Sequence, residues 1–149
     1  LRVGRDGSRT PMHWSASEHA GFSSWESWLP VDSSYRTRNV EQLSARPDSL
    51  LNWYRQLLSA RKASPALHRG DYHEIAGVPK GVFAYTRRAG AEEVAVYLNF
   101  TARRVECPPP DAPEGRAWRV LLSTHEADAA RDLSRIQLAP NEAVLLGAI

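Results

Sequence analysis

PDSLLNWYRQLLSARKASP, residues 47–65, separates two parts of the chain that differ in character. Large apolar residues recur in this stretch at three- and four-residue spacing, at Leu50, Leu51, Tyr54, Leu57 and Leu58. This spacing predicts an amphipathic helix over residues 47–64. Pro47 suits the first turn of such a helix, and Pro65 prevents its continuation.

The part after the helix indicates a series of short strands. Runs rich in β-branched and aromatic residues alternate there with glycine and proline, at residues 72–76, 82–86, 94–100, 117–122, 136–138 and 143–146. Residues 82–86 and 94–98 predict a hairpin that turns through Gly90. We therefore expect a mostly β fold with one long helix, in which the C-terminal part is an antiparallel β-sandwich or Greek-key barrel.

The part before the helix, residues 1–46, shows neither helical nor strand periodicity. It is nevertheless rich in large aromatic residues, namely Trp14, Phe22, Trp25, Trp28 and Tyr35. A disordered linker would contain few of these residues. Rings without regular spacing must be buried against something other than their own secondary structure, so we expect a long structured loop that covers a partner surface.

Charge and composition exclude several classes of function. The 149 residues include 19 basic and 17 acidic side chains, and the basic ones are scattered, so nucleic acid is not an expected partner. The longest apolar run, residues 143–149, is far shorter than the roughly 20 residues of a membrane helix, and no leader pattern opens the chain. We expect no membrane association. Because the single cysteine, Cys107, cannot form an intrachain disulfide, we expect a cytoplasmic protein.

The sequence offers no complete catalytic group. Hydrolysis of a glycosidic bond takes two carboxylates that face each other across the sugar, and none of the acidic residues follows an apolar strand in the way that a buried catalytic carboxyl would. The histidines lack metal-binding spacing, and neither a Gly-x-Ser-x-Gly turn nor a glycine-rich phosphate loop is present. We predict no catalytic residue, no metal and no cofactor in this chain.

Residues 4–14, GRDGSRTPMHW, concentrate the candidate binding chemistry. Arg5 and Arg9 carry planar guanidinium groups that suit carboxylates or vicinal hydroxyls, and Trp14 suits the apolar face of a sugar ring. One interpretation is a carbohydrate pocket. The other is a loop held together by Arg–Asp pairing, with Trp14 in a core, and the residues alone leave both open.

Several blocks of the chain, including this loop, resemble the α-glucosidase, oligo-1,6-glucosidase and trehalose synthase group of glycoside hydrolase family 13, the α-amylase clan. In order, the blocks are GRDGSRTPMHW (4–14), AGFS (20–23), WLPV (28–31), NV (39–40), DSLLNWYR (48–55) and PALHRGDY (65–72), with weaker similarity at 82–87 and 98–100.

The resemblance implies a TIM barrel followed by a β-sandwich. Residues 1–69 would be the C-terminal remnant of the barrel, with its last loop at 1–46 and its closing helix at 47–64, and residues 70–149 would be the sandwich. The family's catalytic carboxylates lie in blocks upstream of all those found in this chain, which implies that the chain is inactive alone.

The resemblance also implies a role in substrate positioning. Arg5 matches the family arginine that holds the hydroxyls of the innermost glucose. Arg9 and Trp14 match neighbouring positions that line the pocket or brace the loop, and His13 stands where many relatives have Gln.

The implied parent is a retaining α-glucosidase that acts on short α-glucosides of the maltose or isomaltose type. A trehalose synthase fragment is one alternative, and a non-catalytic carbohydrate-binding or scaffold module is another. We also expect self-association of the isolated chain through its exposed aromatic loop.

Overall fold

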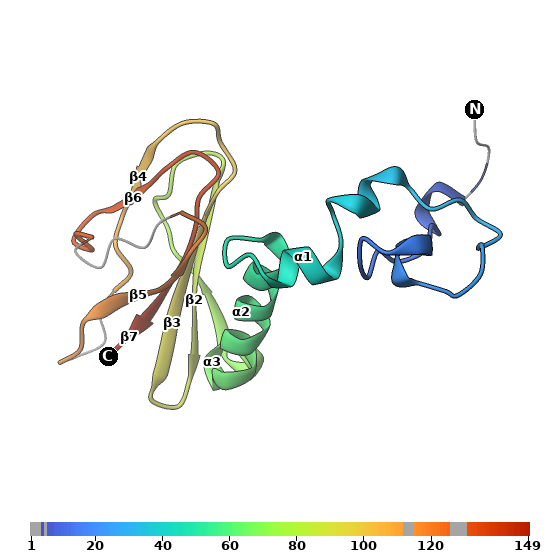
Figure 1. Cartoon of the computed structure of the whole chain (residues 1–149). Coiled ribbons are helices and arrows are strands. Elements are labelled where there is room, and N and C mark those ends of the chain that lie inside the picture. The colour runs from blue at the N-terminus through green and yellow to red at the C-terminus, as the bar shows by residue number, and fades with distance from the viewer. Residues whose placement is uncertain (1–3, 5, 112–114, 126–130) are drawn as a thin grey trace. The chain divides into compact units, whose positions relative to one another are not determined.

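The computed structural model describes residues 4, 6–111, 115–125 and 131–149 of the chain, which forms two compact units (Figure 1). The first unit comprises residues 1–58 and the second comprises residues 59–149. Helix α2 (Leu50–Ala63) contributes residues to both units. No helix within the described residues is long and apolar enough to cross a membrane.

Short helical turns joined by irregular segments build the first unit. These elements are η1 (Asp6–Ser8), η2 (Glu18–Gly21), η3 (Ser33–Arg36), α1 (Val40–Ser44) and the first part of α2. The five-residue helix α1 lies inside the predicted loop and was not expected. Asn39 explains it, because its side chain accepts a hydrogen bond from the backbone N–H of Gln42 at 2.9 Å and so caps the first turn.

Helix α2 starts at Leu50, three residues later than predicted, and ends before Pro65 as predicted. Pro47 forms part of a turn before the helix, and the Ser49 hydroxyl accepts the backbone N–H of Asn52 at 3.2 Å. The apolar side of the helix is largely uncovered in the described part of the chain, with Leu50 70%, Tyr54 58%, Leu57 37% and Leu58 62% exposed.

The second unit continues with helix α3 (Pro65–Arg69) and an antiparallel β domain. Its described strands are β1 (Asp71–Glu74), β2 (Val82–Ala89), β3 (Glu92–Asn99), β4 (Val105–Cys107), β5 (Trp118–Ser123), β6 (Ile136–Leu138) and β7 (Ala143–Ala148). One sheet has the strand order β1-β2-β3-β7-β5, and β4 pairs with β6 in a second sheet. The predicted fold class, one long helix followed by an antiparallel β domain, is confirmed, whereas β4 and α3 were not predicted.

Strands β2 and β3 form the predicted hairpin. Ala89 pairs with Glu92, so that Gly90 and Ala91 make a two-residue turn. Gly90 has a φ of 60° at the first central position of this turn, a conformation that glycine adopts without steric cost.

The main core of the second unit lies between its two sheets. Tyr97 is fully buried in it, and its hydroxyl donates a hydrogen bond to the carbonyl of Pro108 at 3.0 Å. Both sheets contribute to the core, which comprises Ala84, Ala95, Tyr97, Cys107, Ile136, Leu138, Val144 and Leu146. The two sheets therefore form a small sandwich.

The other face of the five-stranded sheet packs against α3. Side chains alternate between the two faces along a strand, so Val94 points away from the core that holds Ala95. Val94 and Leu145 form a second cluster with Ala66 of α3. Figure 1 shows α3 beside β2 and β3.

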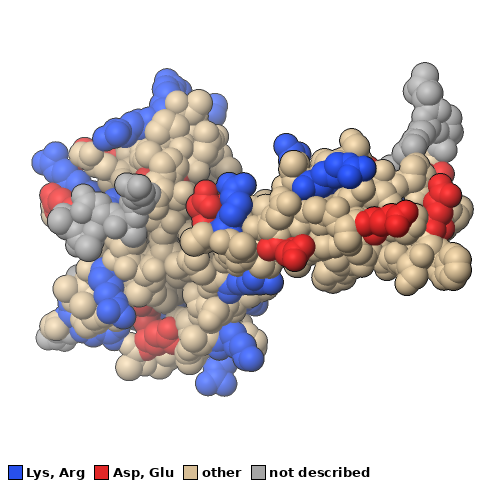
Figure 2. All heavy atoms as spheres, viewed as in Figure 1, with Lys and Arg blue, Asp and Glu red and all other residues tan. Residues whose placement is uncertain are grey.

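Lys and Arg are interspersed with Asp and Glu on the surface shown in Figure 2. The visible face therefore lacks the continuous basic band that nucleic acid binding needs.

Candidate functional site

The aromatic loop of the first unit has a fixed backbone. The backbone N–H groups of Trp14 and Ser15 both donate to the carbonyl of Ala20, at 2.9 and 3.0 Å. His19, Ala20 and Gly21 have positive φ angles of 51°, 59° and 63°. Left-handed backbone is unfavourable for residues with a Cβ, so these hydrogen bonds hold a strained turn in place.

A second set of backbone bonds joins this loop to helix α1. The N–H of Val40 donates to the carbonyl of His13, and the N–H of Glu41 donates to the carbonyl of Trp14, both at 3.0 Å. Asn39, which is 1% exposed, adds a bond from its side-chain nitrogen to the carbonyl of Tyr35 at 2.8 Å. The segment around Trp14 is thus fixed on both sides before any ligand arrives.

A hollow of about 460 Å³ lies in this unit. It is lined by Thr10, His13, Pro30, Val31, Asp32, Ser33 and Ser34. The His13 ring lies edge-on to Tyr35, with their centroids 6.2 Å apart, and its Nδ1 lies 3.1 Å from the carbonyl of Arg38. Hydroxyl, imidazole and carboxylate groups therefore line one hollow of a size that admits a small molecule.

Asp32 carries the negative charge of this hollow. Hydrogen bonds from the Ser34 side chain and from the Ser34 backbone N–H lower the pKa of Asp32 below its usual value, and the positive charges of His13 and Arg38 act in the same direction. The backbone bond measures 2.9 Å. The carboxyl is therefore an ionised acceptor at neutral pH and lacks the raised pKa of a general acid.

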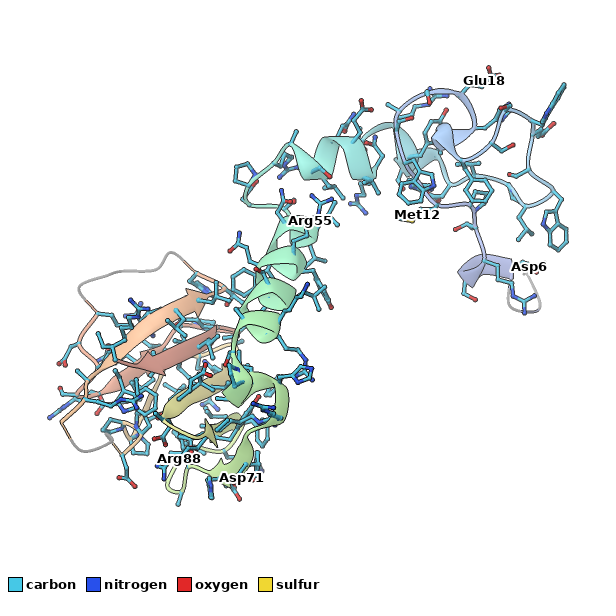
Figure 3. The ribbon with its side chains drawn as sticks, turned by 90° about the horizontal axis from the view of Figure 1, so that it is seen from below. Asp6, Met12, Glu18, Arg55, Asp71 and Arg88 are labelled. Atoms are coloured by element: carbon cyan, nitrogen blue, oxygen red, sulfur yellow. The ribbon has the colours of Figure 1, made fainter. Side chains whose placement is uncertain are left out.

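The three predicted binding residues lie in different situations. Arg5 lies outside the described residues. Arg9 is exposed, and its backbone N–H donates to the carbonyl of Asp6 at 3.1 Å (Figure 3 labels Asp6). Trp14 is 51% exposed, which does not fit the interpretation that places it in a core. No hydrogen bond, ion pair or ring contact joins Arg9 to Trp14 in the described part of the chain.

The sequence did not single out the residues of η3 and its cap. The series Asp32-Ser33-Ser34 could have indicated a turn here. An aspartate followed by a serine two positions later is typical of a turn closed by the aspartate side chain. What the series could not indicate is that this turn faces Thr10 and His13, which precede it by about twenty residues.

The buried carboxylates of the second unit have structural partners. Glu93 is 5% exposed and accepts hydrogen bonds from Arg88, and Glu142 is 4% exposed and accepts hydrogen bonds from Arg131 at 2.8 and 3.2 Å. Among the residues that the structure describes, no three His, Cys, Asp or Glu side chains are grouped as metal ligands.

Comparison with known families divides the chain near the start of the β domain. Residues 2–70 match the model of the α-amylase catalytic domain, and residues 76–145 match the model of the maltogenic amylase C-terminal domain. The oligo-1,6-glucosidase of Bacillus cereus is 36% identical over 144 residues, which cover 95% of this chain and 25% of that enzyme.

Solved structures of related enzymes also match nearly the whole of this chain. The trehalose-6-phosphate hydrolase of Bacillus licheniformis is 31% identical, with a TM-score of 0.80 over 97% of this chain and 26% of that protein. The isomaltulose synthase of Klebsiella sp. LX3 is also 31% identical, with a TM-score of 0.80 over 98% of this chain and 26% of that protein. This chain spans about a quarter of the length of the relatives that it matches. It therefore belongs to the α-amylase family, glycoside hydrolase family 13, and corresponds to the C-terminal portion of an enzyme of the α-glucosidase type.

Proposed function

We propose that this chain supplies a sugar-positioning loop and a supporting β-sandwich to a retaining α-glucosidase that acts on short α-glucosides. The catalytic carboxylates come from the part of the enzyme that precedes the residues seen here. On this proposal, residues 1–69 complete the catalytic barrel, with the last loop at 1–46 and the closing helix at 47–64, and residues 70–149 form the sandwich. The match of residues 2–70 to the catalytic-domain model supports this division.

The observation that carries the proposal is the way in which Trp14 is held. Its backbone is bonded to Ala20 on one side and to Glu41 on the other, while its indole ring stays half exposed. An aromatic ring that is open to solvent and carried on a fixed backbone is suited to stack against the apolar face of a pyranose, because little backbone entropy is lost when the sugar binds. Arg5 and Arg9 add donors for the sugar hydroxyls from the same loop.

The uncovered apolar side of α2 supports the same proposal. Leu50 and Leu58 are 70% and 62% exposed. Burial of a leucine side chain is worth about 1.5–3 kcal/mol, so a face of this kind is expected to pack against the rest of a catalytic barrel.

A chimera tests this function. The C-terminal quarter of the Bacillus cereus oligo-1,6-glucosidase, which this chain matches, is replaced by residues 1–149. We expect the chimera to hydrolyse a chromogenic α-glucoside and the isolated chain to stay at background. Arg9→Ala and Trp14→Ala are each expected to raise KM about tenfold or more, whereas Arg119→Ala, an exposed arginine on β5, leaves KM unchanged.

Two results would refute the proposal. One is turnover by the isolated chain well above background, since this would place the catalytic groups in residues 1–149. The other is a folded, active chimera in which Arg9→Ala and Trp14→Ala behave like Arg119→Ala.

A second candidate is a sugar isomerase or synthase, such as a trehalose synthase, built on the same loop. It is favoured by the similarity to an isomaltulose synthase at the same TM-score as to a hydrolase. Product analysis of the full-length enzyme on maltose separates the two, because a hydrolase releases glucose and a trehalose synthase releases trehalose.

A further inference from the structure

A separate hollow of about 520 Å³ lies within the second unit. Its floor is the core-side face of β1, β2 and β3. In the sheet register, His73 pairs with Thr86, and Arg88 pairs with Glu93, so these side chains share one face. The hollow is lined by His73, Glu74, Ile75, Ala76, Thr86, Arg88, Glu93, Pro108, Pro109, Pro110 and Asp111.

The wall opposite this floor is the segment that leaves β4. Pro108 accepts a hydrogen bond from the buried Tyr97 hydroxyl at 3.0 Å, and Pro110 is buried. Three consecutive prolines have fixed φ angles and cannot donate backbone hydrogen bonds. The wall is therefore rigid and apolar, and it ends in the exposed carboxylate of Asp111.

An ion pair fixes the polar part of the floor. Nη2 of Arg88 lies 3.0 Å from each oxygen of Glu93, and Nε lies 3.2 Å from Oε2. Glu93 is 5% exposed, whereas the Arg88 side chain is 58% exposed. Figure 3 shows Arg88 and Asp71 on the β domain. The pair orients the guanidinium, and its exposed part can donate into the hollow.

The charges in the hollow argue against an anionic ligand. Arg88 is already neutralised by Glu93, and the exposed carboxylate of Asp111 adds a net negative charge. A phosphate would meet net repulsion there. A metal ion is equally disfavoured, because the described residues form no cluster of metal-binding side chains.

With anions and metal ions disfavoured, a neutral polar ligand is left. The hollow presents hydroxyl, imidazole, guanidinium and carboxylate groups that face an apolar wall of prolines. Such a lining offers both donors and acceptors to the hydroxyls of a neutral sugar and an apolar surface to its ring. We propose that this hollow is a second binding site, which takes a neutral mono- or disaccharide independently of the aromatic loop. This inference does not rest on the proposed function, because it concerns the second unit alone.

Binding is tested on the ¹⁵N-labelled 149-residue chain by titration with isomaltose and, separately, with inorganic phosphate. We expect isomaltose at millimolar concentration to shift the backbone amide signals of Ile75, Thr86 and Asp111 together, and phosphate to leave them unchanged. Shifts of these signals by phosphate alone would overturn the proposal in favour of an anion site. The absence of any shift at a 50-fold molar excess of isomaltose, added at millimolar concentration, would overturn it altogether.

Two variants locate the site, and one serves as a matched control. Thr86→Val keeps the shape of the side chain and removes the hydroxyl, and His73→Ala removes the imidazole from the floor. Each is expected to weaken isomaltose binding about fivefold to tenfold, the effect of one lost hydrogen bond. His68→Ala changes another exposed histidine, on α3 and outside the hollow, and is expected to bind as the parent chain does. Equal binding by all three variants would refute the assignment, and folding of each is checked from the unshifted signals of the β7 amides.

Discussion

The hydroxyl of Ser64 donates a hydrogen bond to Oε1 of Glu92 at 2.5 Å, across 28 positions of sequence. The same hydroxyl accepts the backbone N–H of Leu67 at 3.0 Å, and the other oxygen of Glu92 accepts the N–H of Ala66 at 3.2 Å. The Glu92 carboxylate and the Ser64 hydroxyl thus each accept one free N–H group at the start of α3, and the carboxylate complements the dipole of that helix. The contact fixes α3 to the beginning of β3.

Ser64→Ala removes both the cap of α3 and the donor to Glu92. We expect the free energy of unfolding of the second unit to fall by about 1–2 kcal/mol, the usual effect of a lost N-cap. The measurement is urea denaturation followed by circular dichroism. Ser59→Ala, an exposed serine on α2, is the control and should change the value by less than about 0.5 kcal/mol. Equal losses for the two variants would show that the Ser64–Glu92 contact contributes nothing.

The other end of α3 is held by Arg87 of β2. Its Nε and Nη2 donate to the carbonyl of Gly70 at 3.2 and 2.7 Å, and its Nη1 donates to the carbonyl of Leu67 at 2.9 Å. A planar guanidinium can donate to both carbonyl groups at once in this forked geometry, whereas the ammonium group of a lysine cannot. Arg87→Met should lower the free energy of unfolding by about 2–3 kcal/mol, and Arg87→Lys should recover little of that loss.

The matched control for Arg87 is Arg119→Met, which changes an exposed arginine on β5. We expect it to leave the urea midpoint within the experimental error. Full stability of Arg87→Lys would contradict the fork geometry, because it would mean that charge alone is sufficient.

Local patterns were enough to predict α2 and the β2–β3 hairpin, since leucine spacing and Gly90 report on interactions between near neighbours in sequence. The same patterns missed β4, whose three residues, Val105–Cys107, are too few to show a period. They also missed α3, because Pro65 ends one helix and begins the next. Such short elements depend on contacts from distant residues, as α3 does on Arg87 and Glu92.

Prediction of the aromatic loop from sequence was limited in the same way, because local patterns do not report contacts between distant residues. The motif of this loop identified Arg9 and Trp14, because arginine and tryptophan carry recognisable chemistry. The hollow beside them depends on how η3 folds back toward His13, and no spacing in the sequence encodes that distance. The charged lining of the second hollow was likewise unpredictable, since it combines β1, β2, β3 and the proline segment.

Stability is expected to decrease in acid because of Glu142. Burial raises the pKa of this carboxyl, but hydrogen bonds from Arg131, from the N–H of Ala139 and from Ser123 outweigh it, so that the pKa is lowered from its ordinary value of 4.5. A group whose pKa is lower in the folded state stabilises the fold above its ordinary pKa, and this contribution is lost as pH falls through the folded-state pKa.

The prediction for Glu142 is a difference between pH profiles. In the parent chain, the urea midpoint should be constant near neutral pH and should fall as pH decreases below about 5. Glu142→Gln should be less stable at pH 7, and its profile should be flatter over the acidic range. Glu26→Gln, an exposed carboxylate of the first unit, should follow the parent profile. Parallel profiles for Glu142→Gln and the parent would refute the assigned role.

The exposed aromatic residues of the first unit predict self-association of the isolated chain. Trp25 and Trp28 are 81% and 86% exposed, and large apolar patches promote association. We expect sedimentation to show a molecular mass that rises with concentration, and the double variant Trp25→Ser and Trp28→Ser to reduce this rise. As a control, Phe100→Ser changes a residue of the second unit that is 71% exposed. A monomeric parent chain at high micromolar concentration would contradict the prediction.

Ala20 gives the sharpest test of strain in the candidate loop. It has a φ of 59° and is fully buried, and its carbonyl receives the N–H groups of Trp14 and Ser15. Ala20→Gly relieves about 1–2 kcal/mol of left-handed backbone strain, which exceeds the roughly 0.8 kcal/mol lost when the buried methyl group is removed. The amides of Trp14 and Ser15 should therefore be protected from hydrogen exchange at least as well as in the parent. Ala16→Gly, at an exposed position with no positive φ, has only the entropic cost of glycine and should lower that protection. Ala20→Val should abolish it, because a β-branched residue fits left-handed backbone poorly. Equal loss of protection in Ala20→Gly and Ala16→Gly would mean that the turn at Ala20 stores no strain.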